Sequence, residues 1–212
     1  MTDYDFWLFD LDGTLVDVEP AYARQVIANT GARLGYHFSE QQAEQLWYSI
    51  GGPPEYHLQR WGIDPDRFWT AFHEIEDPQE RANHTFLYHD AQAVGDLRDA
   101  VGLVTHCQPY LAQPVLRRLG IDDWFDVIIC CNDELGWKPD PAPIKSAMRQ
   151  LGLSQDATGV VVGDTADDIG AAWNAGLDGI HIERHDPDRR GCCVWADYRL
   201  ESCDELRSVV DY

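Results

Sequence analysis

The apolar residues of this chain gather in short, unbroken runs spread along its length. Such runs lie at 6–9, 101–104, 127–130, 160–162 and 179–182. Strands that are covered by helices on both faces carry continuous apolar runs, whereas strands with one solvated face alternate. The pattern therefore predicts a parallel sheet that is buried on both of its faces.

Helical patterns separate several of these runs, at 109–119, 140–151 and 165–175, and a glycine follows each of them. Glycine commonly ends a helix, and the Thr165 side chain is suited to cap the start of the third one. Pro114 lies inside the first pattern, where it is expected to shift or kink the start of the helix. Alternating strands and helices predict an α/β fold with a Rossmann-like, doubly wound parallel sheet.

Residues 18–88 break this alternation. Helices are expected there at 20–34, 40–49 and 65–75, with a fourth beginning near Pro78, and no convincing strand pattern occurs. The segment therefore predicts an all-helical domain inserted after the first strand. The expected division is a core formed by 1–17 and 89–212, with 18–88 as the inserted domain.

The charge of the chain is strongly negative. Asp and Glu number 37 against 16 Lys and Arg, which gives a net charge of −21. Such a surface repels nucleic acid, so we expect no nucleic-acid partner. The presence of only two lysines favours the hypothesis of adaptation to high salt, where counterions screen the repulsion.

Neither a membrane segment nor a secretory leader is indicated. No apolar run is long enough to span a bilayer, and the N-terminal residues are acidic rather than basic. We therefore expect a cytoplasmic protein with no membrane partner. The six cysteines form no CxxC pattern, so reduced thiols are expected rather than a zinc site.

Polar residues follow the predicted strands at the end where ligands bind in an open α/β sheet. These residues are Asp10, Asp12, Thr105, Lys138, Asp164 and Asp168. Clustered carboxylates are unfavourable unless a cation neutralises them, and hard oxygen ligands favour Mg²⁺. A threonine hydroxyl and a lysine are suited to bind phosphate, while a carboxylate can attack phosphorus.

Four ordered motifs resemble those of the haloacid dehalogenase superfamily, in its phosphoglycolate phosphatase-like branch. They are Phe9-Asp10-Leu11-Asp12-Gly13-Thr14-Leu15-Val16-Asp17, Val104-Thr105-His106, Lys138-Pro139-Asp140-Pro141, and Val162-Gly163-Asp164-Thr165-Ala166-Asp167-Asp168-Ile169. Each motif is a weak signal alone, but all four in order are specific, and together they span most of the predicted core.

The resemblance implies a role for each acidic residue. Asp10 corresponds to the nucleophile and to a Mg²⁺ ligand. Asp12 corresponds to the general acid and base, and its backbone carbonyl to a second ligand. Asp164 corresponds to the second ligating carboxylate, and Asp168 is expected to orient Lys138 and the waters of the metal.

The resemblance also implies a phosphate site and a cap. Thr105 and Lys138 correspond to phosphate-binding residues, and residues 18–88 correspond to a helical cap that closes over the site. His106 is expected either to contact phosphate or to be structural. For substrate specificity the candidates are Gly51, Gly52, His57 and Arg60, although a solvated helix face is the preferred explanation for Arg60.

These features predict an enzyme that hydrolyses a small phosphorylated metabolite. A dehalogenase is disfavoured because Asp12 supplies an acid that dehalogenation does not need. A phosphonatase is disfavoured because the predicted cap contains no lysine. Two alternatives stay open: a sugar phosphomutase of the β-phosphoglucomutase type, and a non-catalytic binding protein on the same fold.

Overall fold

The computed structural model describes residues 4–154, 156–186 and 193–210, and these form two compact units. The first consists of the described parts of Met1–Asp17, Phe86–Arg184 and Val194–Tyr212. The second consists of Val18–Thr85 with the described part of His185–Cys193. Each unit has its own buried apolar cluster, so each is described separately.

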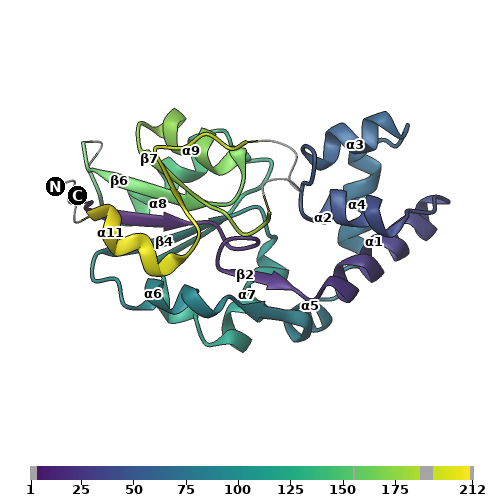
Figure 1. Ribbon diagram of the computed structural model, residues 1–212, viewed down its shortest axis with the longest axis horizontal. Coiled ribbons are helices and arrows are strands. Elements are labelled where there is room, and N and C mark those ends of the chain that lie inside the picture. Colours follow the sequence, from purple (N-terminus) through teal and green to yellow (C-terminus); the bar gives the residue numbers. More distant parts are fainter. Residues whose placement is uncertain (1–3, 155, 187–192, 211–212) are drawn as a thin grey trace. The chain divides into compact units, whose positions relative to one another are not determined.

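A six-stranded parallel sheet organises the first unit (Figure 1). Its strands, in spatial order, are β5 (Val127–Cys130), β4 (Ala100–Thr105), β1 (Phe6–Phe9), β6 (Gly159–Gly163), β7 (Asp178–Ile182) and β8 (Tyr198–Leu200). The predicted apolar runs supply the first five of these strands. β8 was missed because its run is only three residues long and includes Arg199.

Helices cover both faces of this sheet, as the continuous apolar strands require. One face packs on α8 (Ala142–Gln150) and α9 (Ala166–Ala175), with Phe6 and Leu8 of β1 in the shared cluster. The other packs on the helices α6 (Gln92–Gly95), α7 (Pro109–Leu119) and α11 (Leu206–Val210), with Trp7 and Phe9 in the shared cluster. The predicted doubly wound α/β fold is confirmed.

The second unit is built from helices. They are α1 (Pro20–Leu34), α2 (Glu40–Trp47), α3 (Pro54–Arg60), α4 (Pro65–Ile75) and α5 (Pro78–His84). Their apolar faces enclose Ile27, Leu58 and Phe68, each at most 1% exposed. The sequence analysis missed α3, because its Pro-Glu-Tyr-His start directly follows the Gly-Gly-Pro breaker.

One local expectation was wrong. A short strand, β3 (Thr85–Leu87), occurs within 18–88 and pairs with β2 (Val16–Val18). The N-cap residue of α1 is Glu19, and the Asp17 carboxylate accepts a hydrogen bond from the Tyr88 hydroxyl. Pro114 lies inside α7 without shifting its start, which is at Pro109, and a kink there stays a prediction.

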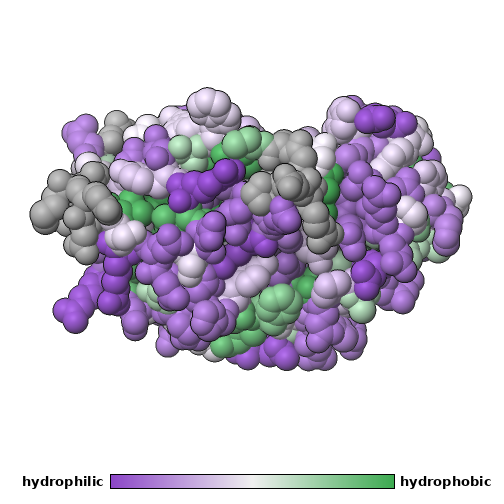
Figure 2. Space-filling view, viewed as in Figure 1, coloured by the Kyte–Doolittle hydropathy of each residue, from purple (hydrophilic) through white to green (hydrophobic). Residues whose placement is uncertain are grey.

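The exposed surface is mainly hydrophilic on the face drawn in Figure 2. Among the helices that the structure describes, none is both long enough and apolar enough to cross a bilayer. Among the large apolar side chains of the described residues, that of Trp195 is the most exposed, at 80%.

Candidate active site

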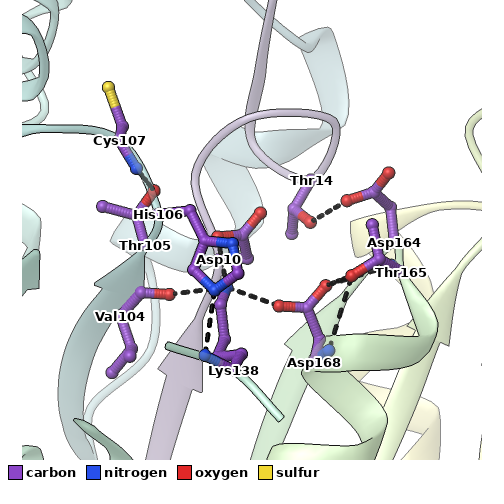
Figure 3. Close-up of polar contacts among 10 residues, drawn as sticks. All are labelled: Asp10, Thr14, Val104, Thr105, His106, Cys107, Lys138, Asp164, Thr165 and Asp168. Atoms are coloured by element: carbon purple, nitrogen blue, oxygen red, sulfur yellow. Dashed lines mark hydrogen bonds and ion pairs between the residues drawn. The ribbon is translucent and has the colours of Figure 1, made fainter. Parts of the chain in front are cut away.

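Three of the predicted residues lie together at the carboxyl ends of the central strands. Phe9 at the end of β1 lies in register with Leu103 of β4 and Val162 of β6. Asp10, Thr105 and Asp164 follow or end these strands and are all at most 7% exposed. Parallel strands with matched ends therefore place chain segments that are far apart in sequence within one site (Figure 3).

Lys138 lies at the centre of this site. Its Nζ donates to Asp10 Oδ1 at 2.7 Å, to Asp168 Oδ1 at 2.5 Å and to the Val104 carbonyl at 3.0 Å. Burial alone would lower the pKa of Lys138, but the carboxylates of Asp10 and Asp168 outweigh it and raise that pKa. The ammonium group thus stays charged and holds Asp10 in a fixed orientation.

Asp168 serves both its helix and the site. Its Oδ2 accepts from the backbone N–H and the hydroxyl of Thr165, at 3.0 and 2.6 Å, while its Oδ1 binds Lys138. Burial raises the pKa of Asp168, but Lys138 and Thr165 outweigh this and hold it below its usual value. The predicted capping box at the start of α9 is confirmed, and it fixes the carboxylate that orients Lys138.

His106 contacts the loop of Lys138. The Lys138 backbone N–H donates to His106 Nε2 at 2.9 Å, and the imidazole packs edge-on against Trp137. Because Nε2 accepts a hydrogen bond, the ring is neutral and carries its proton on Nδ1. Of the two roles expected for His106, this contact is the structural one.

Thr105 ends β4 and is 1% exposed. Its Oγ1 accepts the backbone N–H of Cys107 at 3.0 Å, which orders the turn that follows the strand. A hydroxyl that accepts through its oxygen still has its own proton to donate. The side chain is therefore suited to donate to a phosphate oxygen.

The loop after β1 passes close to Asp164. Gly13 has φ = +77°, and a Cβ at this position would lie 2.5 Å from Asp164 Oδ2, so only glycine fits without displacement. The Thr14 hydroxyl donates to Asp164 Oδ1 at 3.3 Å. Asp12 is half-buried on the same loop, and its charge is one of those that raise the pKa of Asp10.

Carboxylate oxygens of Asp10, Asp164 and Asp168 lie within 4.8 Å of one another, which fits a hard divalent cation. Burial raises the pKa of Asp10 to about 7 despite the opposing Lys138, so a second positive charge would favour its ionised form. Both oxygens of Asp168 already accept hydrogen bonds. Asp10 and Asp164 are therefore better placed than Asp168 to hold the ion.

The candidate specificity residues lie in the second unit. His57 is 5% exposed, and its Nε2 donates to the Ile50 carbonyl at 2.8 Å, so it supports the adjoining Gly51-Gly52 turn. Arg60 is exposed and donates to the Tyr56 hydroxyl at 3.1 Å. Their part in specificity stays a prediction.

A second group of buried polar residues, which was not predicted from the sequence, lies behind the Asp10–Thr14 loop. Arg184 and Asp90 form an ion pair of 2.7 Å whose side chains are 7% and 6% exposed. A signal was available, because Arg184 directly follows a predicted buried strand at the end where the site lies. It went unused because none of the four motifs includes it.

Known proteins resemble this chain over most of its length. Residues 7–182 match the family described as haloacid dehalogenase-like hydrolase. A phosphoglycolate phosphatase of Colwellia psychrerythraea is 31% identical over 188 residues, which cover 82% of each chain. The pyrophosphatase PpaX of Halalkalibacterium halodurans is 27% identical over 217 residues, covering 96% of this chain and 95% of the relative.

Among solved structures, the fold is shared with a haloacid dehalogenase-like hydrolase of Streptococcus pneumoniae. The TM-score is 0.78, with 19% identity, and the match covers 99% of this chain and 100% of the other. At this level of identity the likeness concerns the fold alone.

Proposed function

This chain belongs to the haloacid dehalogenase-like hydrolase family, and on that premise we propose that it hydrolyses a small phosphate monoester with Mg²⁺ through an aspartyl-phosphate on Asp10. The family resemblance stated from the four motifs is confirmed by the match over residues 7–182. Relatives that are named phosphatases support the choice of a phosphate ester over a haloacid as the substrate.

The observation that carries the proposal is the buried contact between Lys138 and Asp10. A nucleophilic carboxylate must be ionised and aligned, and an ammonium group 2.7 Å from Oδ1 aligns it and favours its ionised form. Asp168 holds the same ammonium from its other side. Burying one lysine and two carboxylates costs folding free energy, because the charges lose their hydration. A role in the reaction therefore explains this cluster better than a role in stability.

In the proposed reaction Asp10 attacks phosphorus, and the bond to the leaving oxygen breaks. Asp12 gives that oxygen its proton and then takes a proton from the water that attacks the aspartyl-phosphate. Phosphate leaves and the Asp10 carboxylate is restored. Thr105 donates to a phosphoryl oxygen during both steps, and the positive charge of Lys138, whose three protons are held by Asp10, Asp168 and the Val104 carbonyl, offsets the negative charge of the phosphoryl group.

Asp10, Asp164 and the backbone carbonyl of Asp12 would hold Mg²⁺. The ion, when bound, supplies positive charge that offsets the negative charge of the phosphate and the carboxylates. The chain contributes the orientation of these ligands, through Lys138 on Asp10 and Thr14 on Asp164. The second unit is proposed to act as the cap that excludes water.

The first test is turnover of p-nitrophenyl phosphate with Mg²⁺, with EDTA, and after Mg²⁺ is added back. We expect turnover, its loss and its return. A panel of 2-phosphoglycolate, pyrophosphate and sugar 1-phosphates, followed by ³¹P NMR, then identifies the product. Release of free phosphate supports the proposal, while isomerisation of a sugar 1-phosphate without phosphate release supports the mutase. Absence of metal-dependent turnover on the whole panel supports a binding protein.

A further inference from the structure

A buried arginine donates two hydrogen bonds to the loop that carries the proposed nucleophile. Arg184 lies just beyond β7, and its guanidinium donates from both Nε and Nη2 to the Thr14 carbonyl, at 3.1 and 2.8 Å. This pair of hydrogen bonds fixes the position of one peptide oxygen at the end of the Asp10–Thr14 loop. Arginine is the side chain that can make such a two-pronged contact, since lysine carries a single nitrogen.

The guanidinium is itself held from other directions. Its Nη1 donates to Asp90 Oδ2 at 2.7 Å, and its Cζ lies over the ring of Tyr88, 4.1 Å from the ring centre. Asp90 Oδ2 also accepts from the Ser202 hydroxyl at 3.0 Å and from the Cys203 backbone N–H at 2.8 Å. Arg184 is therefore a fixed point on which the loop can be anchored.

The anchored residue also contacts the proposed metal site. Thr14 is fully buried, and while its carbonyl accepts from Arg184, its hydroxyl donates to Asp164 Oδ1 at 3.3 Å. Gly13 passes so close to Asp164 that a Cβ there would lie 2.5 Å from Oδ2. A rotation of the Thr14 peptide would therefore disturb Asp164 as well as the loop that begins at Asp10.

We propose that Arg184 is a positioning residue that sets the Asp10–Thr14 loop against Asp164 and so pre-forms the Mg²⁺ site. The inference rests on the proposed function. Arg184 acts through Thr14, and it lies outside the set of residues assigned from the motifs. Groups that orient metal ligands from behind typically change metal affinity by roughly 10–100-fold when they are removed.

A purely stabilising ion pair is the competing explanation, and two variants separate it from positioning. Arg184→Lys keeps a positive charge but cannot donate from two nitrogens to the Thr14 carbonyl. Asp90→Asn with Arg184→Met removes both buried charges together, which typically leaves stability near or above that of the parent. In both variants the Thr14 carbonyl loses its paired donors.

A matched control exists in the second unit. Arg81 Nη1 and Glu76 Oε1 form a 3.2 Å ion pair whose side chains are 5% and 2% exposed, as deeply buried as Arg184 and Asp90. The double variant Glu76→Gln with Arg81→Met therefore repeats the same chemical change away from the Asp10–Thr14 loop.

The measurement is calorimetric titration of each full-length variant with MgCl₂ without substrate, together with its melting temperature. We expect Mg²⁺ to bind roughly 10–100-fold more weakly to both Arg184 variants, and within about twofold of wild type to the control. Wild-type Mg²⁺ affinity in the double variant Asp90→Asn, Arg184→Met would overturn the inference, and so would an equal loss in the control. A wild-type protein that neither binds Mg²⁺ nor turns over any phosphate ester would instead overturn the proposed function.

Discussion

At the scale of single residues, the site depends on how one ammonium group is shared between two buried carboxylates. Lys138 contacts both Asp10 and Asp168, and each partner is at most 10% exposed in its side chain. One ammonium group faces two carboxylates, so the loss of Lys138 leaves both carboxylates without an opposing charge in a dry environment. The chain contains only one other lysine, Lys145, and it is exposed on α8.

Lys138→Met is therefore expected to abolish activity and to lower the free energy of unfolding by about 3–5 kcal/mol near neutral pH. Without the ammonium, burial raises the pKa of both carboxylates in the folded state, so the folded variant binds protons that the unfolded chain does not. The deficit should shrink as pH falls from 8 to 5. Urea unfolding of the wild type and of Lys138→Met at pH 8 and at pH 5 measures the deficit in unfolding free energy.

Lys145→Met is the matched control, and its unfolding free energy should stay within about 0.5 kcal/mol of wild type. A Lys138→Met deficit that is no larger than this, or one that grows as pH falls, would contradict the account of the buried charges.

His106 provides a second test at this scale. Although the residue as a whole is exposed, desolvation of its ring and the nearby charge of Lys138 lower the pKa of the imidazole to about 4. The folded pKa lies below the unfolded value, so the hydrogen bond from the Lys138 backbone contributes fully above pH 6.5 and is lost as pH falls toward 4.

NMR titration of the imidazole nitrogens should show the Nδ1–H tautomer with a midpoint near pH 4. His106→Phe, which keeps a ring beside Trp137 but offers no acceptor, should be less stable than wild type at pH 7, with the difference narrowing toward pH 4. A midpoint at or above 6.5 would refute the assignment of Nε2 as an acceptor.

At the scale of elements, the fold was predictable wherever a pattern was long and bounded. β5 (Val127–Cys130) and α4 (Pro65–Ile75) occur at the predicted bounds, because a continuous apolar run and a Pro-started amphipathic pattern are each distinctive. The missed strands β3 and β8 are three residues long, and each is stabilised by pairing with another strand, β2 and β7 respectively. No local pattern reports such a partner.

The candidate site divides in the same way. The sequence places Asp10, Thr105 and Asp164 together, because each lies at the end of a strand that an apolar run predicts. The pairing of Lys138 with Asp168 was expected from family resemblance rather than from spacing. The contact between Arg184 and Asp90 could not be predicted, since it joins residues 94 positions apart and neither belongs to a motif. The position of Arg184 after a predicted strand was the only available signal.

The cap of α2 gives the prediction at this scale. The Ser39 hydroxyl accepts from the Gln42 backbone N–H at 3.2 Å, and the Gln42 side chain accepts from the Ser39 N–H at 3.0 Å. Ser39→Ala should lower the free energy of unfolding by about 1 kcal/mol, while Ser39→Asp, which keeps an acceptor, should stay close to wild type. Chemical denaturation distinguishes the two, and equal stabilities would show that the cap contributes nothing.

At the scale of the whole molecule, the net charge of −21 opposes the compact state. Salt shortens the range of this repulsion from roughly 10 Å at 0.1 M to roughly 3 Å at 1 M. If the chain is adapted to high salt, its melting temperature and its Mg²⁺-dependent turnover should both rise between low and molar KCl. Equal stability at the two concentrations would contradict the hypothesis.

The central claim is that Asp10 is the nucleophile, and the most direct measurement compares kcat/KM of the wild type with that of Asp10→Asn. Asp167→Asn is the matched control, because the same change is made nearby at the first turn of α9, and the identity of each variant is verified by mass spectrometry. The account predicts a loss on the order of 10⁴–10⁶-fold for Asp10→Asn and near wild-type turnover for the control. Turnover by Asp10→Asn within tenfold of wild type would contradict it.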